Sequence, residues 1–145
     1  YTFNAEEIML MHEHVMDETN DSANAGIKYL DRFESMLKRP QTILFGEESF
    51  PSILEKACVY FHSISNDHIF INGNKRTASY VFLTYLDLHD LVLHMNIDEF
   101  EDYVLQITVE EKYKTNDAIS FIVEDLKQFV GEVNIHLHWM FEDED

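Results

Sequence analysis

Apolar side chains recur along most of this chain every three or four residues, the spacing that places them on one face of an α-helix. In the first such segment Ile8, Met11 and Val15 share a face. The pattern predicts about six helices, at residues 4–18, 27–38, 52–66, 74–89, 98–107 and 116–130. We therefore expect an all-α, mainly helical fold.

Capping boxes mark the starts of two of these helices. Asn4 is followed three residues later by Glu7, and Ser52 by Glu55. In such a pair each side chain accepts a hydrogen bond from the other residue's backbone N–H, which satisfies two groups that a helix start leaves without partners. The helices at 4–18 and 52–66 therefore have defined beginnings.

Three segments break the helical pattern. Residues 41–50 are expected to be extended, with Gly46 at a turn, and residues 91–96 to form a short extended link. Residues 133–141 alternate at first, as an edge strand would, and four acidic residues then end the chain.

The composition fits one domain over residues 1–145. With 46% hydrophobic and 13% aromatic side chains, the chain can bury a substantial core. A formal charge of −18 argues against nucleic-acid binding, which needs a basic face. The single cysteine, Cys58, is expected to be a packed thiol in a reducing, cytoplasmic setting, and no apolar run reaches membrane-spanning length.

Several histidines suggest metal binding only weakly. His12 and His14 point apart on a helix, so we expect one at the core edge and one in solvent. His62 is expected to be structural. His136 and His138 would share one face of a strand, as metal ligands can, but no third ligand is evident.

The stretch at residues 68–78, His-Ile-Phe-Ile-Asn-Gly-Asn-Lys-Arg-Thr-Ala, carries most of the candidate chemistry. Gly73 permits a turn that a Cβ would obstruct, and Asn74 is expected to cap the helix that follows. The positive end of that helix would then point at the turn.

Two cations, Lys75 and Arg76, fall in the first turn of this helix, where the dipole alone disfavours them. Their placement makes sense if an anion such as phosphate binds there. His68, on the other side of the turn, is a candidate proton acceptor beside that anion.

The same stretch resembles the signature of the Fic/Doc family, H-x-F-x-[D/E/N]-[G/A]-N-[G/K]-R. Lys75 is similar to the death-on-curing (Doc) branch, whereas the adenylylating Fic branch usually has a second Gly there. Residues 35–41, Ser-Met-Leu-Lys-Arg-Pro-Gln, look like the L-x-R-P-Q segment of Doc-like proteins, and residues 50–63 look like the helix before their motif. The resemblance covers residues 4–130 and leaves 131–145 as an acidic C-terminal extension.

The resemblance implies a role for each motif residue. His68 would be the general base, and Arg76 would bind a phosphate group. The anion hole would consist of Gly73, Asn74 and Lys75.

Position 72 usually carries the Asp or Glu that holds Mg²⁺ in this family. Here Asn72 offers a neutral oxygen, which predicts weaker metal binding. Phe70 is expected to be an apolar anchor for the loop, without chemistry of its own.

Within residues 41–50, the resemblance implies a β-hairpin flap beside the active site. Its exposed edge, formed by Ile43, Leu44, Phe45 and Gly46, would pair with the backbone of a target protein. An ordinary surface loop is the alternative.

With Lys75 in the anion hole, the resemblance to Doc-like proteins implies that ATP binds in an inverted orientation and presents its γ-phosphate. The resemblance thus implies a Doc-like toxin that phosphorylates a hydroxyl of a target protein, in the family a threonine of elongation factor Tu, and arrests translation. ATP and Mg²⁺ would be the cofactors. The alternatives are transfer of AMP, or a degenerate copy that binds without turnover, a reading that Asn72 motivates.

The resemblance also implies control by a separately encoded antitoxin, whose disordered tail folds into a groove near the site. Many Fic proteins instead carry a self-inhibitory helix with the pattern [S/T]-x-x-x-E-[G/N]. Residues 120–125 come near it but end in Asp125, and we interpret them as an amphipathic core helix.

Overall fold

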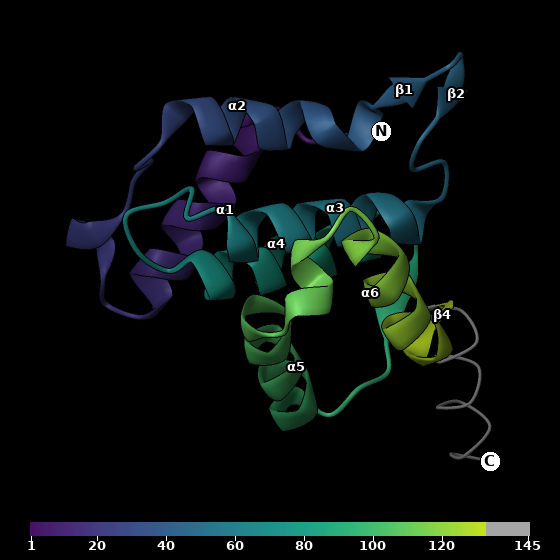
Figure 1. The fold of residues 1–145 in the computed structure, drawn as a ribbon. Helices are drawn as coiled ribbons and strands as arrows, with labels where there is room; N and C mark the ends of the chain where they lie inside the picture. Colours follow the sequence, from purple (N-terminus) through teal and green to yellow (C-terminus); the bar gives the residue numbers. More distant parts are fainter. Residues whose placement is uncertain (133–145) are drawn as a thin grey trace.

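The structure, a computed structural model, describes residues 1–132 (Figure 1). Over these residues the fold is mainly helical, as predicted. The helices are α1 (Ala5–Glu18), α2 (Leu30–Lys38), α3 (Ile53–Asn66), α4 (Asn74–Leu88), α5 (Ile97–Val109) and α6 (Ala118–Leu126). Short 3₁₀ turns join them: η1 (Ser22–Asn24), η2 (Arg39–Gln41), η3 (Glu111–Lys114) and η4 (Lys127–Phe129). No helix in this range is long and apolar enough to cross a membrane.

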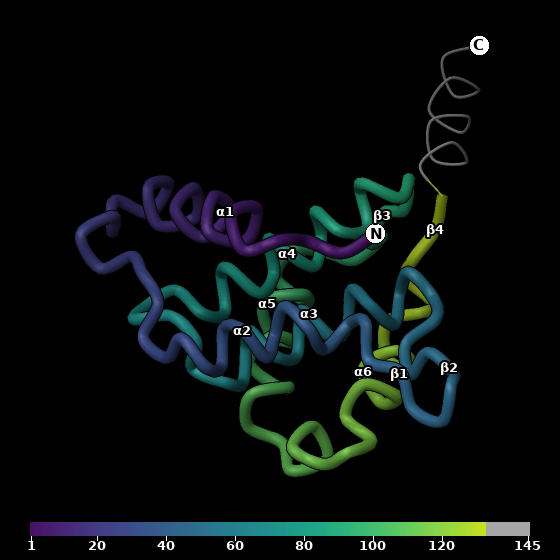
Figure 2. Tube along the Cα trace, turned by 90° about the horizontal axis from the view of Figure 1, so that it is seen from above, coloured from purple at the N-terminus to yellow at the C-terminus, as the bar shows by residue number. Residues whose placement is uncertain are grey.

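The core lies around the pair α3 and α4, with α1, α5 and α6 packed about it (Figures 1 and 2). Phe61 of α3 is fully buried, and its ring centroid lies 5.0 Å from that of Phe82 in α4 and 5.6 Å from that of Phe100 in α5. Cys58 is also fully buried, and burial raises the pKa of its thiol, as expected for a packed and unreactive cysteine.

Both predicted capping boxes are present, at Asn4 with Glu7 and at Ser52 with Glu55. They set the starts of α1 and α3, which agree with the prediction to within one residue. A cap depends on residues three apart in the sequence, so it can be found without knowledge of the rest of the fold.

The predicted start of the second helix was wrong, because α2 begins at Leu30 and not at residue 27. Ile27 instead forms an antiparallel bridge with Phe70. The backbone N–H groups of Lys28 and Tyr29 both donate to the carbonyl oxygen of Ile69, at 2.8 and 3.2 Å. Residues 27–29 thus run extended beside the motif, and these long-range hydrogen bonds replace the first turn of the helix.

The end of the last predicted helix was also wrong. It stops at Leu126, and the chain then forms η4 and the strand β4 (Val130–Glu132). This strand pairs antiparallel with β3 (Leu91–Leu93), which falls in the predicted extended link. The tail at 133–141, with His136 and His138, and the acidic residues after it lie outside the described residues.

The predicted hairpin is confirmed. The strands β1 (Ile43–Leu44) and β2 (Glu47–Glu48) pair with Leu44 opposite Glu47. The two turn residues, Phe45 and Gly46, have φ of 54° and 80°, the positive values that a type I′ turn requires. The side chain of Phe45 is fully exposed at the tip.

The resemblance implied that the hairpin lies beside the motif, but the structure places the two at opposite ends of α3. The hairpin precedes the N-terminal end of α3, whereas the motif follows the C-terminal end (Figures 1 and 2). Fourteen helical residues separate the two ends, a length of about 21 Å.

His12 joins four parts of the fold. It is fully buried, and its Nε2 accepts a hydrogen bond from the backbone N–H of Gly26 at 3.0 Å. The proton therefore sits on Nδ1, which donates to Oγ1 of Thr77 at 2.9 Å. The ring also stacks on Phe70 with 3.9 Å between centroids. Burial, together with the charge of Arg76, lowers the pKa of His12 to about 4.

We expect His12 to make the protein less stable in mild acid. Between pH 6.5 and about 4 the unfolded chain binds a proton that the folded chain excludes, so stability rises with pH across this window. The contribution that is present above pH 6.5 and lost by about pH 4 is about 2–3 kcal/mol.

Urea unfolding of the wild type, His12→Gln and the control His14→Gln over this pH range tests the expectation. His14→Gln is the matched control, because it removes an exposed histidine of the same helix and leaves the buried ring in place. His12→Gln should flatten that slope. Equal slopes in all three proteins, or a wild-type His12 that titrates near 6.5 by NMR, would contradict the assignment.

Candidate active site

The prediction that Asn74 caps the helix after the motif was wrong, and Asn74 instead bonds the two ends of the motif loop together. Gly73, with a φ of 73°, is the N-cap residue of α4, and Asn74 is the first residue inside the helix. The side chain of Asn74 reaches back to Phe70, accepting from its N–H at 2.9 Å and donating to its carbonyl oxygen at 3.0 Å. Asn74 therefore clamps the loop to the helix, because only a side-chain amide offers both a donor and an acceptor here.

Gly73 is required by space as well as by conformation. A Cβ built on it would collide with Sδ of Met16, which is fully buried in α1. The glycine therefore lets α1 approach the start of α4 closely. This approach brings the residues at the end of α1 up to the motif.

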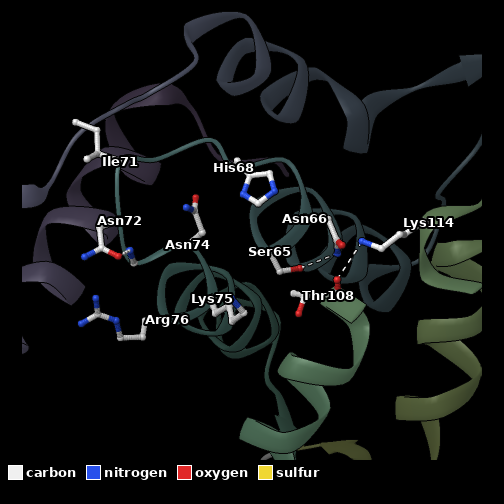
Figure 3. Close-up of a pocket in the computed structure, with 11 residues that line it drawn as sticks. Ser65, Asn66, His68, Ile71, Asn72, Asn74, Lys75, Arg76, Thr108 and Lys114 are labelled. Carbon is white, nitrogen blue, oxygen red and sulfur yellow. Dashed lines mark hydrogen bonds between the residues drawn. The ribbon is translucent and has the colours of Figure 1, made fainter. Parts of the chain in front are cut away.

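An open cavity of about 520 Å³ lies at the N-terminal end of α4 (Figure 3). Figure 3 shows Asn72 and Arg76 at one end, Asn66 and Lys114 at the other, and His68 between them. The N-terminus of α4 adds backbone N–H groups that have no acceptor within the helix. The lining residues are Ser65, Asn66, His68, Ile71, Asn72, Gly73, Asn74, Lys75, Arg76, Thr108 and Lys114.

The cavity brings together the six motif residues to which the sequence assigned chemistry. It also contains residues that sequence reasoning missed. Ser65 and Asn66 immediately precede the motif and could have been proposed from that position. Thr108 and Lys114 come from α5 and η3, and no local pattern connects them to the motif.

His68 sits in a restricted backbone conformation, with a φ of 52°. It follows the end of α3, where Arg32 donates to the carbonyl oxygen of Asp67 at 2.9 Å. Non-glycine residues rarely adopt this region, and where they do, the surrounding structure must hold them there. The exposed imidazole points into the space between Asn74 and Ser65 (Figure 3). It is placed to take a proton from a group that enters the cavity.

Arg76 is tied to the end of α1 and the loop after it. One guanidinium nitrogen donates to Oγ1 of Thr19. The other lies 3.6 Å from Oδ2 of Asp21 and 3.9 Å from Sδ of Met16. The guanidinium is thus oriented, while 41% of the side chain stays exposed for an anion to contact.

The Asn72 amide lines the cavity and is hydrogen-bonded at both its oxygen and its nitrogen. Its Oδ1 accepts from the backbone N–H of Gly73 at 2.9 Å, and its Nδ2 donates to Oδ2 of Asp21 at 2.9 Å. Within the described residues no three His, Cys, Asp or Glu side chains are grouped to hold a metal ion. Asn72 is therefore an oriented amide with its oxygen already engaged.

Phe70 anchors the motif in the core, and Arg39 attaches the base of the hairpin to α3. Phe70 is buried against His12. Arg39, in the segment similar to L-x-R-P-Q, donates to Oγ of Ser63 at 2.8 Å and to Nδ1 of His62 at 2.9 Å. His62 in turn donates to the carbonyl oxygen of Tyr113 at 2.6 Å, so it is structural. These contacts fix η2, the base of the hairpin, to α3.

A second, apolar groove of about 490 Å³ runs between α1, α4 and α5. It shares Lys75 and Arg76 with the cavity, so the two lie side by side. Leu83 and Leu105 are 41% and 54% exposed along it. Apolar side chains line most of the groove, and Lys75, Arg76, Glu18 and Glu101 add charged groups to its lining.

Two comparisons with known proteins found similarity to this chain, one with a family model and one with a single protein. A model of the Fic/DOC family matches residues 2–86. The protein named Toxin Doc from Mycolicibacterium smegmatis is 26% identical over 80 residues, which cover 54% of this chain and 62% of that protein. The match thus spans less than two thirds of the relative. No solved structure matches this chain significantly.

We expect Gly73→Ala to destabilise the protein more than Gly46→Ala does. Both glycines have positive φ, which costs an alanine about 1–2 kcal/mol. Only Gly73 also faces a collision, with buried Met16, whereas the space around Gly46 is open. Gly73→Ala should lower the free energy of unfolding by about 2–4 kcal/mol, as measured by urea unfolding. Equal losses in the two variants would show that α1 can move away.

Proposed function

The chain belongs to the Fic/DOC family, and we propose that it is a Doc-like toxin that transfers the γ-phosphoryl group of ATP to a hydroxyl of a target protein. The observation that carries this proposal is Lys75, which lines the cavity at the position where a glycine would leave room for two phosphates. By resemblance the target is a threonine of elongation factor Tu, and the consequence is arrest of translation. We propose accordingly that the protein acts in the cytoplasm.

In the proposed reaction His68 accepts the proton of the target hydroxyl. The hydroxyl oxygen forms a bond to the γ-phosphorus as the bond from that phosphorus to the β-bridging oxygen breaks, and ADP leaves. Lys75, Arg76 and the N-terminus of α4 stabilise the phosphate charge, the main task of a protein in phosphoryl transfer. When bound, Mg²⁺ supplies further neutralisation of that charge. At the far end of the cavity Lys114 is a third cation within reach of a long ligand.

The hairpin remains our proposed docking element for the target. Its apolar residues Ile43, Leu44 and Phe45 are all more than half exposed, so a target strand could pair along its edge. The helix α3, about 21 Å long, lies between the hairpin and His68 in the chain, so an extended target segment that spans its length would need about six further residues to reach the base.

Labelled ATP distinguishes the proposed reaction from its alternatives. With elongation factor Tu, Mg²⁺ and γ-³²P-ATP, we expect the label on the target, and a rate at least about 100-fold lower for His68→Ala because general-base catalysis is lost. His14→Ala, an exposed histidine on α1, should retain activity.

Label from α-³²P-ATP on the target would instead establish AMP transfer. No label from either nucleotide, on elongation factor Tu or in a whole lysate, would indicate a copy that acts by binding.

We also propose that the apolar groove between α1, α4 and α5 binds the antitoxin. Its exposed leucines suit the apolar face of a helix that forms on binding. The shared residues Lys75 and Arg76 would put such a helix at the edge of the nucleotide cavity, where it could interfere with ATP or with the target.

Leu83→Glu tests this groove. In co-expression with the antitoxin that the resemblance implies, the wild type should retain that protein through purification, and Leu83→Glu should lose it, because a charge would be buried in the apolar interface. Leu10→Glu is the matched control, since Leu10 is 60% exposed and does not line the groove. Retention by Leu83→Glu would exclude the groove as the main contact.

A further inference from the structure

The cavity around His68 has two ends of different chemistry (Figure 3). At one end lies the guanidinium of Arg76, oriented by the residues after α1. The other, which we call the Lys114 end, is lined by Ser65, Asn66, Thr108 and Lys114. In phosphoryl transfer the attacking and leaving oxygens lie roughly in line, so the nucleotide and the target approach from opposite sides. With phosphates at the Arg76 end, the target would enter from the Lys114 end.

Lys114 is held in place without being neutralised. Its Nζ donates to the carbonyl oxygen of Thr108, near the end of α5, at 3.0 Å. Within residues 1–132 it forms no ion pair with a carboxylate, although the chain carries 28 acidic residues. An ammonium group has three N–H donors, so Lys114 keeps two of them for a ligand.

Asn66 lies next to Lys114 (Figure 3) and offers an acceptor. Its Nδ2 donates to Oγ of Ser65 at 3.2 Å and to the carbonyl oxygen of His62 at 3.3 Å. Its Oδ1 is buried and has no hydrogen-bond partner in the described part of the chain, an unfavourable state that a donor from a ligand would relieve. Lys114 and Asn66 thus present a donor and an acceptor, the two groups that bind the C=O and the N–H of a peptide backbone.

The residue before Lys114 fixes the turn η3. Tyr113 is fully buried. Its hydroxyl donates to Oδ2 of Asp125 in α6 at 2.5 Å, and its carbonyl oxygen accepts from Nε2 of His62 in α3 at 2.6 Å. Side chain and backbone are therefore both bonded, and η3 could carry Lys114 away from the cavity only by breaking these bonds.

The same histidine connects η3 to the hairpin. Nδ1 of His62 accepts from Arg39 at 2.9 Å, and the carbonyl oxygen of Arg39 accepts from the backbone N–H of Thr42 at 3.1 Å. The N–H of Ser49 donates to the carbonyl oxygen of Thr42 at 2.9 Å, which closes the base of the hairpin. A continuous series of contacts thus joins the hairpin to the Lys114 end of the cavity.

We propose that Lys114 and Asn66 bind the backbone of the target segment that carries the acceptor hydroxyl, and that His62 is a positioning residue that holds Lys114 there. The inference rests on the proposed function, because it requires a protein target. The hairpin lies at the opposite end of α3 from His68, so a second contact beside the base is needed to orient the hydroxyl. Backbone hydrogen bonds supply that contact whatever side chains flank the hydroxyl.

The kinetics of elongation factor Tu phosphorylation by Lys114→Met test the inference. Methionine keeps an unbranched apolar stem but donates no hydrogen bond. We expect the KM for elongation factor Tu to rise about 10-fold or more, as for the loss of a hydrogen bond to a charged group, and the KM for ATP to stay at the wild-type value. Lys112→Met, the matched control, removes the same charge from the same turn outside the cavity lining and should change neither constant.

The role of His62 is tested by a conservative replacement. His62→Ala should raise the KM for elongation factor Tu, and His62→Gln, whose amide can accept from Arg39 and donate to Tyr113, should restore most of the loss. Adding Lys114→Met to His62→Ala should have little further effect, because both act through one contact. A role in stability alone would leave the KM of the folded His62→Ala protein unchanged.

The other outcomes overturn the inference. If Lys114→Met leaves the KM for elongation factor Tu unchanged, Lys114 does not touch the target, and the proposed function stands. If Lys114→Met raises the KM for ATP instead, the Lys114 end belongs to the nucleotide, and phosphoryl transfer again stands. If the wild type labels neither elongation factor Tu nor any protein of a lysate, the inference and the proposed function fall together.

Discussion

A single buried and uncharged imidazole joins the elements that build this site. His12 bonds the loop after α1 through Gly26, bonds α4 through Thr77 and stacks on Phe70 of the motif. It can do this only as the neutral tautomer with its proton on Nδ1, since Nε2 must accept. Burial of the ring and the charge of the nearby Arg76 both lower the pKa of His12 and so favour the neutral imidazole. The geometry of the end of the cavity that Arg76 lines therefore depends on a protonation state as well as on packing.

Local features of the sequence predict much of this fold, and long-range pairing accounts for the errors. The capping boxes and the periodic apolar faces locate α1, α3 and α4 closely, because caps and periodicity involve residues a few positions apart. The start of α2 and the end of α6 were misplaced. At both places a distant segment, Ile69 or β3, takes the backbone hydrogen bonds that a helix would have used.

The residues of the site also divide into those that a local pattern predicts and those that come from distant parts of the chain. The motif lines the cavity because its residues are consecutive, and a turn followed by a helix N-terminus brings them together. Thr108 and Lys114 enter from other elements, and their sequence surroundings do not distinguish them from ordinary polar residues. Asn74 was assigned to the site but given the wrong structural role, because its position before an apolar helix suits a cap, and only the structure reveals its bonds to Phe70.

The cavity is a small cationic region in a strongly anionic protein. The chain carries a formal charge of −18, yet Lys75, Arg76 and Lys114 converge on one opening. Beyond the Debye length, about 8 Å at physiological ionic strength, an approaching anion is screened from all of these charges. Nearer the surface it meets general repulsion before the local attraction. Salt should thus speed the encounter of an anionic ligand with the cavity while it weakens the final contact. A basic protein partner should show the opposite dependence, because the field of the protein attracts it and salt screens that attraction.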